Sequence, residues 1–144
     1  MQLKNLIIDS KSAWVDFPGL PGFSVEVVNL SRKEIQGLRK RCITQKLDRK
    51  SRTMEEVLDE EKFVEHFTGS TIKNWKGLTL EHLETLILID TADKNLSDEL
   101  PYSKDNAEIL VSQSTEFDAW LNEVVFDLDN FRTVGEREVL GTSN

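Results

Sequence analysis

Apolar and polar positions alternate in the first part of the chain, at the spacing of a half-buried strand. Two such stretches, Trp14 to Phe17 and Phe23 to Val27, flank a run from Pro18 to Gly22 that holds two prolines and two glycines. Residues of these types mark tight turns. The pattern therefore predicts a β-hairpin over residues 10–28. A lone hairpin is marginal in water, so we expect its apolar face to pack on the segment that follows.

The spacing of apolar residues then becomes helical. Ser31 and Glu34 have the spacing of a capping box, and Ile35, Leu38 and Cys42 follow at helical intervals. This predicts a helix that begins after Ser31 and buries Cys42 as a small apolar side chain. The alternative is a reactive thiol, activated by the basic residues beside it.

A second capping-box pattern, from Thr53 to Glu56, predicts another helix that ends at Gly69. Its inward positions are Val57, Phe63, Val64 and Phe67. Residues 70–77 are interpreted as a short turn that carries Ile72 and Trp75 and is ended by Gly77.

The remaining segments also favour helices. We expect a short helix after Thr79, a polar loop from Asp90 to Leu100 and a helix capped by Ser103. The last helix has a broad apolar stripe of Phe117, Trp120, Leu121, Val124, Val125, Leu128 and Phe131.

These elements predict a mainly α fold, a small helical domain with an N-terminal β-hairpin packed on it. Residues 1–144 would form one domain, with the hairpin at 10–28, a helical body at 31–132 and a frayed polar tail at 133–144. The length of 144 residues suits one independent core. Trp75, Trp120 and Phe131 are expected in that core, whereas Trp14 could either cover it or be an exposed anchor for a partner.

Composition narrows the class of protein. Apolar residues make up 38% and charged residues 31%, which is ordinary for a folded chain, and the single cysteine fits a reducing compartment. No apolar run approaches the roughly 20 residues that span a bilayer, and the N-terminus lacks the apolar core of a signal peptide. We therefore expect a cytoplasmic protein with no membrane partner.

Charge is unevenly distributed along the chain. Residues 32–52 hold nine basic residues against two acidic ones, a net +7. Because the whole chain carries −8, the remainder carries −15. The basic segment is either a solvated helix face or a docking surface for an acidic protein, which could be a second copy of this chain. Binding of nucleic acid through this segment is the alternative function, although the segment has no aromatic side chains for base stacking.

Residues for catalysis do not converge in the sequence. His66 and His82 lack the spacing of a metal site, and there is no glycine-rich phosphate loop. Acidic pairs are abundant, but nothing places two of them across a cleft. We predict no enzymatic activity and no cofactor.

Several short stretches, in order, are similar to the tail assembly chaperones of long-tailed phages and prophages. The stretches are Trp14 to Phe17, Phe23 to Val27, Leu30 to Ile35, Ile72 to Leu78, Pro101 to Ala107 with Leu110, Phe117 to Leu121 and Asp129 to Arg132. In that family the stretches that correspond to Ile72–Leu78 and Pro101–Ala107 are joined by a shorter loop with glycine, whereas residues 79–100 of this chain are longer and lack glycine.

The resemblance implies a mostly helical, non-catalytic protein in the cytoplasm of a bacterial host. It would bind the tape measure protein and help to recruit tail tube subunits, and copies could associate head to tail. Candidate partner-binding residues are Arg39, Lys40, Arg41, Lys46 and Trp14.

Overall fold

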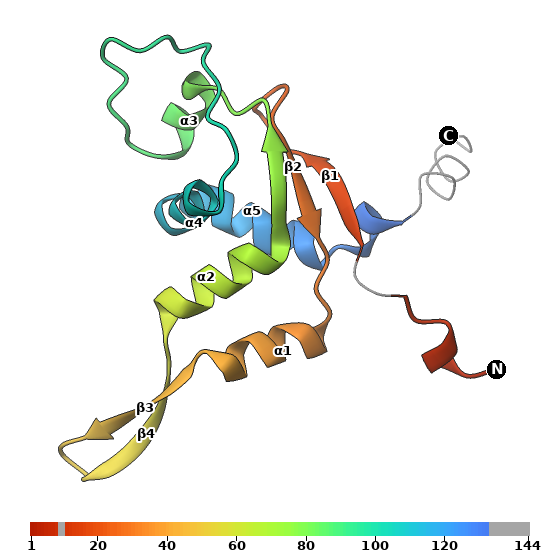
Figure 1. Cartoon of the computed structure of the whole chain (residues 1–144), viewed down its shortest axis with the longest axis vertical. Coiled ribbons are helices and arrows are strands. Elements are labelled where there is room, and N and C mark those ends of the chain that lie inside the picture. Colours follow the sequence, from red (N-terminus) through yellow and green to blue (C-terminus); the bar gives the residue numbers. More distant parts are fainter. Residues whose placement is uncertain (9–10, 133–144) are drawn as a thin grey trace.

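The computed structural model describes residues 1–8 and 11–132. In these residues 45% are helical and 22% lie in strands, which form two small sheets (Figure 1). The prediction of a mainly α fold is therefore wrong, because the described chain is an α/β mix. The predicted frayed tail, residues 133–144, lies outside the described residues.

A three-stranded antiparallel sheet lies at the centre of the molecule. Its strand order is β1 (Ser12–Asp16), β2 (Ser24–Val28) and β5 (Ile72–Lys76). β1 and β2 pair in the register that places Val15 opposite Val25, which confirms the predicted hairpin. After β2 the chain leaves the sheet, and it re-enters the sheet as β5, which pairs with the other edge of β2.

Five helices of the described residues lie beside this sheet; two of them make most of the contacts with its strands, and the other three pack on those two. The five helices are α1 (Arg32–Arg41), α2 (Glu60–Thr71), α3 (Leu80–Leu86), α4 (Lys104–Gln113) and α5 (Thr115–Phe126), with short 3-10 turns η1 (Leu3–Asn5) and η2 (Leu128–Phe131). α5 contacts β2, α4 contacts both α2 and α5, and α1 lies against α2 (Figure 1).

Side-chain caps fix where the helices begin. The Ser31 hydroxyl accepts the Glu34 backbone N–H at 3.1 Å, and the Glu34 carboxylate accepts the Ser31 N–H at 3.2 Å. This reciprocal pair is the predicted capping box. At the starts of α3 and α4 only the side chain of the cap residue takes part: the hydroxyls of Thr79 and Ser103 each accept a backbone N–H of the first helical turn. Both predicted helix starts are confirmed.

The second predicted capping box is wrong. Thr53–Leu58 is a strand, β4, paired with β3 (Ile43–Asp48) in a separate two-stranded sheet. α2 begins only after Asp59, whose carboxylate accepts the Lys62 N–H at 3.1 Å. Gly69 does not end this helix, which continues to Thr71.

Residues 70–77 are also not the predicted turn. Ile72–Lys76 is β5, and a β-bulge shifts its register against β2 between Glu26 and Val27. The bulge leaves one extra residue in β5, so Ile72 and Trp75 both face the core although they are three positions apart.

α3 is the predicted short helix after Thr79, and the segment that follows it is the predicted polar loop. Leu100 brings the loop back to the body, because its N–H donates to the Leu78 carbonyl at 2.8 Å. The indole N–H of Trp75 donates to the carbonyl of Leu100 at 2.9 Å. A buried tryptophan with a satisfied N–H thus fixes the loop to the sheet.

The core joins the hairpin to the last helix. Phe17 and Phe23 stack with Phe117 at ring-centroid distances of 6.0 and 6.3 Å, and Trp120 lies 4.9 Å from Phe17. Trp75 and Phe131 are buried as predicted, and Trp120 is half-buried against the same cluster. The predicted apolar stripe breaks at Leu128, which is exposed because α5 ends at Phe126 and η2 turns the chain.

Gly77 is required where β5 meets the turn of the hairpin. Its φ is +74°, and a Cβ there would lie 1.9 Å from the carbonyl oxygen of Gly22. We expect Gly77→Ala to lower the free energy of unfolding by at least about 2 kcal/mol, because backbone strain and a backbone clash add. Urea denaturation monitored by tryptophan fluorescence measures this.

The matched control is Gly69→Ala, since Gly69 lies inside α2 with no atom within 4 Å of the added Cβ. In this variant the free energy of unfolding should rise by about 0.5–1 kcal/mol. Equal stabilities for the two variants would contradict the role given to Gly77.

Candidate protein-binding surface

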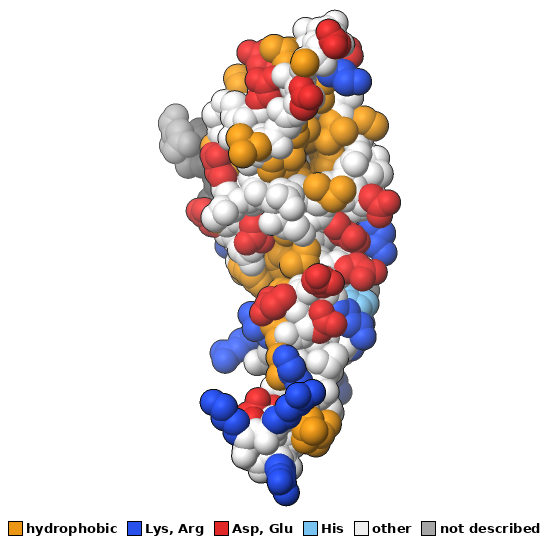
Figure 2. Space-filling view, turned by 90° about the vertical axis from the view of Figure 1, so that its left-hand side faces the viewer, with side chains coloured by type: hydrophobic (Ala, Val, Ile, Leu, Met, Phe, Trp, Pro, Cys, Tyr) orange, Lys and Arg blue, Asp and Glu red, His pale blue; other side chains and the backbone are white. Residues whose placement is uncertain are grey.

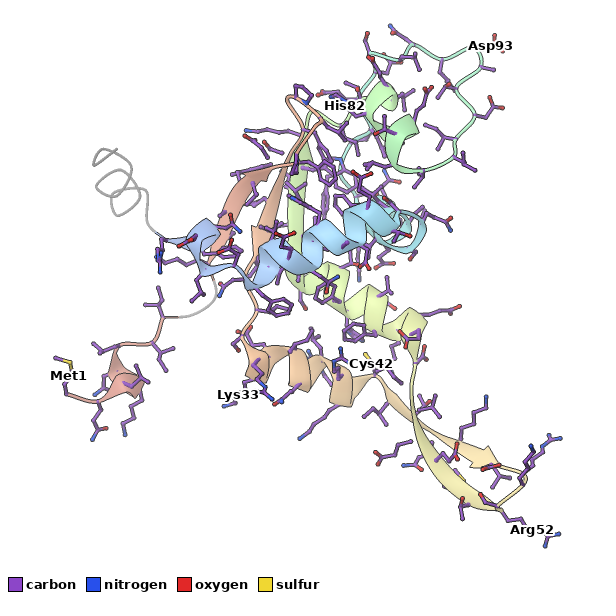
Figure 3. All side chains as sticks on the ribbon, turned by 180° about the vertical axis from the view of Figure 1, so that it is seen from behind. Met1, Lys33, Cys42, Arg52, His82 and Asp93 are labelled. Atoms are coloured by element: carbon purple, nitrogen blue, oxygen red, sulfur yellow. The ribbon has the colours of Figure 1, made fainter. Side chains whose placement is uncertain are left out.

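A two-stranded arm projects from the body of the molecule. It consists of β3, β4 and the turn between them, residues 43–58 (Figure 1). The Cys42 carbonyl accepts the Asp59 N–H at 2.8 Å and closes the base, while Arg52 lies at the far end (Figure 3). Six paired residues on each strand make the arm about 20 Å long.

One face of the arm carries two apolar cross-strand pairs, with the polar pair of Gln45 and Glu56 between them. Residues directly opposite each other in an antiparallel pair share a face, and the pairs Ile43 with Leu58 and Leu47 with Met54 fall on the same one. Leu47 is 56% and Met54 59% exposed. We call these four residues the apolar face of the arm. An isolated two-stranded hairpin is marginal in water, so this face is where a partner would add most stability.

The far end of the arm is basic. Lys46, Arg49, Lys50 and Arg52 are all exposed and form what we call the basic tip. Asp48 lies among these four cations, so residues 46–52 carry a net +3, and Glu55 and Glu56 on β4 reduce the net charge of the whole arm, residues 43–58, to +1. Hydrogen bonds from the Lys50 backbone N–H and the Ser51 hydroxyl lower the pKa of the Asp48 carboxyl, because they favour its charged form. Asp48 therefore orders the turn that presents the cations.

An acidic groove lies between α2 and α4. Its volume is about 700 Å³. It is lined by Glu60, Glu61, Val64, Glu65, Asp105, Glu108, Ile109, Ser112 and Gln113. Ile109, 54% exposed, and the half-buried Val64 supply apolar surface among five carboxylates. Figure 2 shows acidic side chains gathered above the arm, and basic side chains with hydrophobic ones among them on the arm itself.

The predicted partner-binding residues do not form one cluster. Arg39, Lys40 and Arg41 lie in the last turn of α1, where positive charge complements the helix dipole. The guanidinium of Arg39 lies 5.3 Å from the centre of the Phe63 ring, so it also packs on α2. Lys46 lies on the arm, opposite Glu55.

Trp14 occupies a different surface. It lies on β1 opposite Glu26, on the face of the sheet that the helices leave open, and is 43% exposed. The ammonium of Lys76 lies 4.7 Å from the centre of its ring. Trp14 therefore does not cover the core, and its aromatic face already holds a cation within the chain.

The basic segment is divided between two elements. Residues 32–52 form α1 and then the first strand and the turn of the arm. They do not form the single basic helix that was one of the predicted possibilities. Arg41 lines a second hollow, of about 650 Å³, with Lys33 and Lys73 over a floor that includes Leu30 and Leu38. The cations of this segment thus face at least two surfaces.

Residues that could support chemistry are few in the described chain. Cys42 is buried, as predicted, and His82 contacts the carbonyl of Pro21 at 3.0 Å through Nε2. Among residues 1–8 and 11–132, no group of three or more His, Cys, Asp or Glu side chains could hold a metal ion. The helices of the described residues all lack the length and apolar composition that a membrane-spanning helix requires. The absence of enzymatic activity stays a prediction.

Comparison with known proteins adds no assignment. No family model, no curated protein and no solved structure matches this chain. The surface features of the described residues therefore carry the functional argument.

Sequence reasoning missed the apolar face of the arm. The signal was present, because Ile43, Gln45 and Leu47 occupy alternate positions before a polar turn, and Met54 and Leu58 follow at an even spacing. The helical interpretation of Thr53–Glu56 concealed it. A hairpin with a four-residue loop explains both runs at once.

If the apolar face is uncovered, its truncation should leave the body of the protein stable. We expect the double variant Leu47→Ser/Met54→Ser to change the free energy of unfolding by less than about 1 kcal/mol. Leu121→Ala, at a fully buried position, should lower the free energy of unfolding by about 2–5 kcal/mol. Urea unfolding measures both, and a loss above 2 kcal/mol in the arm variant would show that the face is packed.

Proposed function

We propose that this chain is a non-enzymatic protein-binding protein that works as a phage tail assembly chaperone. Its partners would be the tape measure protein and the tail tube protein, in the cytoplasm of the bacterial host. The observation that carries the proposal is the arm, which presents an uncovered apolar face next to a basic tip.

The physical case rests on what such an arm can do. Exposed apolar side chains on a projecting element favour binding to another protein, because contact removes them from water. A tape measure protein is a long helical chain that exposes apolar stripes before the tube forms. Leu47 and Met54 offer adaptable apolar surface of the kind that transient contacts use.

The resemblance to tail assembly chaperones supports the choice of partner. It also implied a mostly helical protein, and the α/β architecture contradicts that part of the expectation. The stretches that carry the resemblance fall on the hairpin, the start of α1, β5, α4, α5 and η2, and none of them lies on the arm. The proposal therefore depends on the arm and on the order of these stretches rather than on fold class.

Nucleic-acid binding is the weaker alternative. Its support was the basic segment 32–52, and the cations of that segment are divided between α1 and the arm. No aromatic side chain accompanies them on the arm. A continuous positive surface with stacking platforms would favour nucleic acid, and this arrangement favours protein instead.

The test is co-purification with a tape measure protein, which the proposal expects to be encoded near the gene of this chain. We expect the wild-type chain to keep the tape measure protein soluble when the two are co-expressed. The variant Leu47→Ser/Met54→Ser should weaken the capture by about tenfold or more, because two anchor side chains of a contact are lost.

The matched control is Leu88→Ser/Leu128→Ser, which removes two exposed leucines from other surfaces. It should capture the tape measure protein as the wild type does. If the wild type captures none, the chaperone proposal fails, and a gel-shift with DNA and RNA at two salt concentrations then tests the alternative.

A further inference from the structure

The hollow beside α1 is a second surface suited to a partner. It is bordered by α1, by the ends of β2 and α2 and by the start of β5, and its volume is about 650 Å³. We propose that this hollow receives an acidic amphipathic helix of a partner protein, which lies along α1 and packs against Gly37. This inference goes beyond the proposed function, because the hollow is separate from the arm and its ligand is defined by chemistry alone.

Three cations surround the hollow. Lys33 and Arg41 stand on α1 and Lys73 on β5, and all three side chains are exposed. Among the described residues that line the hollow, Glu34 is the single acidic one, so three positive charges and one negative charge give a net +2. The Glu34 carboxylate already accepts the Ser31 N–H in the capping box. Carboxylates of a partner would therefore meet a positive rim.

The bottom of the hollow is apolar. Leu30 and Leu38 are buried there, and Val28 is half-buried. A ligand that carried charge alone would leave this floor in water, whereas an apolar side chain would cover it. An apolar floor within a cationic rim therefore favours a ligand that is both acidic and amphipathic.

The charges on α1 are spread along the hollow and do not gather at one point. Lys33 lies near the start of α1 (Figure 3), and Gly37 and Arg41 follow at intervals of four residues. These three positions form one stripe that is about 12 Å long. A single phosphate or carboxylate could not reach both of its ends. A helix that lies along α1 has the same rise per residue, so acidic residues eight positions apart would lie over Lys33 and Arg41.

Gly37 interrupts this stripe without a reason inside the described chain. It lies in the interior of α1 with helical backbone, where glycine destabilises a helix relative to alanine. A Cβ at Gly37 would have no packing neighbour within 4 Å among the described residues, so their packing does not require a glycine. A glycine at this position does allow the backbone of another helix to approach α1 closely.

The net charge of the chain makes a peptide test selective. Because the chain carries −8, most of the molecule repels an acidic peptide, and binding must come from a local positive surface. The probe is an acidic peptide of about 18 residues, long enough to form a helix, with leucines on one face and glutamates beside them. A control peptide has the same composition in a scrambled order that lacks the apolar face.

Fluorescence anisotropy of the labelled peptides measures the dissociation constants. We expect the wild type to bind the probe, and to bind it more weakly as salt is raised. The scrambled peptide should bind at least about tenfold more weakly, because it cannot cover the apolar floor. The arm variant Leu47→Ser/Met54→Ser should bind the probe as the wild type does, since the arm is a separate surface.

Charge reversal on α1 tests the cationic rim. The variant Lys33→Glu/Arg41→Glu should raise the dissociation constant by about tenfold or more. The matched control is Arg32→Glu/Lys40→Glu, which makes the same charge change at exposed positions of the same helix that do not line the hollow. It should change the dissociation constant by less than about threefold. Equal losses in the two variants would show that charge alone attracts the peptide.

A side chain at Gly37 tests the close approach. Gly37→Leu should raise the dissociation constant by about tenfold or more, because the added side chain occupies the space of the partner helix. The midpoint of its urea unfolding should rise, because leucine favours a helix more than glycine does and the site is open. Gln36→Leu adds the same side chain at the neighbouring exposed position and should bind as the wild type does. A lower midpoint or unchanged binding in Gly37→Leu would contradict the role given to Gly37.

The proposal is overturned if the wild type does not bind the probe, if the scrambled peptide binds equally well, or if the arm variant loses the binding. Sedimentation velocity tests a second copy as the occupant. Self-association of the wild type that is lost in Lys33→Glu/Arg41→Glu would assign the hollow to another copy and overturn the proposal. Failure of the probe to bind would leave the chaperone proposal standing, because that proposal depends on the arm.

Discussion

The pairing of β2 on both of its edges is the constraint on which the rest of the structure depends. One edge takes β1 through a local hairpin, and the other takes β5, which arrives only after residues 29–71 have left the sheet and returned. Those residues must therefore form an excursion whose two ends lie close together. α1 and α2 pack against each other as its two sides, and the arm is the part of the excursion that extends beyond them.

Local signals in the sequence were sufficient for elements that depend on local contacts. The Ser31 and Glu34 capping box, the caps at Thr79 and Ser103, and the Pro-Gly turn of the first hairpin all form as their residues predict. Each of these needs only neighbours within about four positions. The strand β5 could not be predicted in this way, because its partner is β2. The bulge opposite Glu26 and Val27 places its buried residues three apart, which is a helical spacing.

The candidate site was predictable only in its charge. The net +7 of residues 32–52 was visible, and Lys46 lies on the arm. Arg39, Lys40 and Arg41 lie instead at the end of α1, and Trp14 lies on the open face of the sheet. Thr53–Glu56 has the spacing of a capping box, yet Asp59 caps the helix, so two patterns competed for one stretch of chain. The pairing of β3 with β4 decided between them, and pairing depends on residues that a local pattern does not include.

The length of the arm gives the charge distribution its physical meaning. The body carries most of the −15 that balances the basic segment, so at short range the tip would be neutralised by its own chain. At physiological salt the Debye length is about 8 Å, and the arm holds the tip about 20 Å from its base. The basic tip is therefore screened from the acidic body of its own copy while it remains free to approach an acidic surface closely.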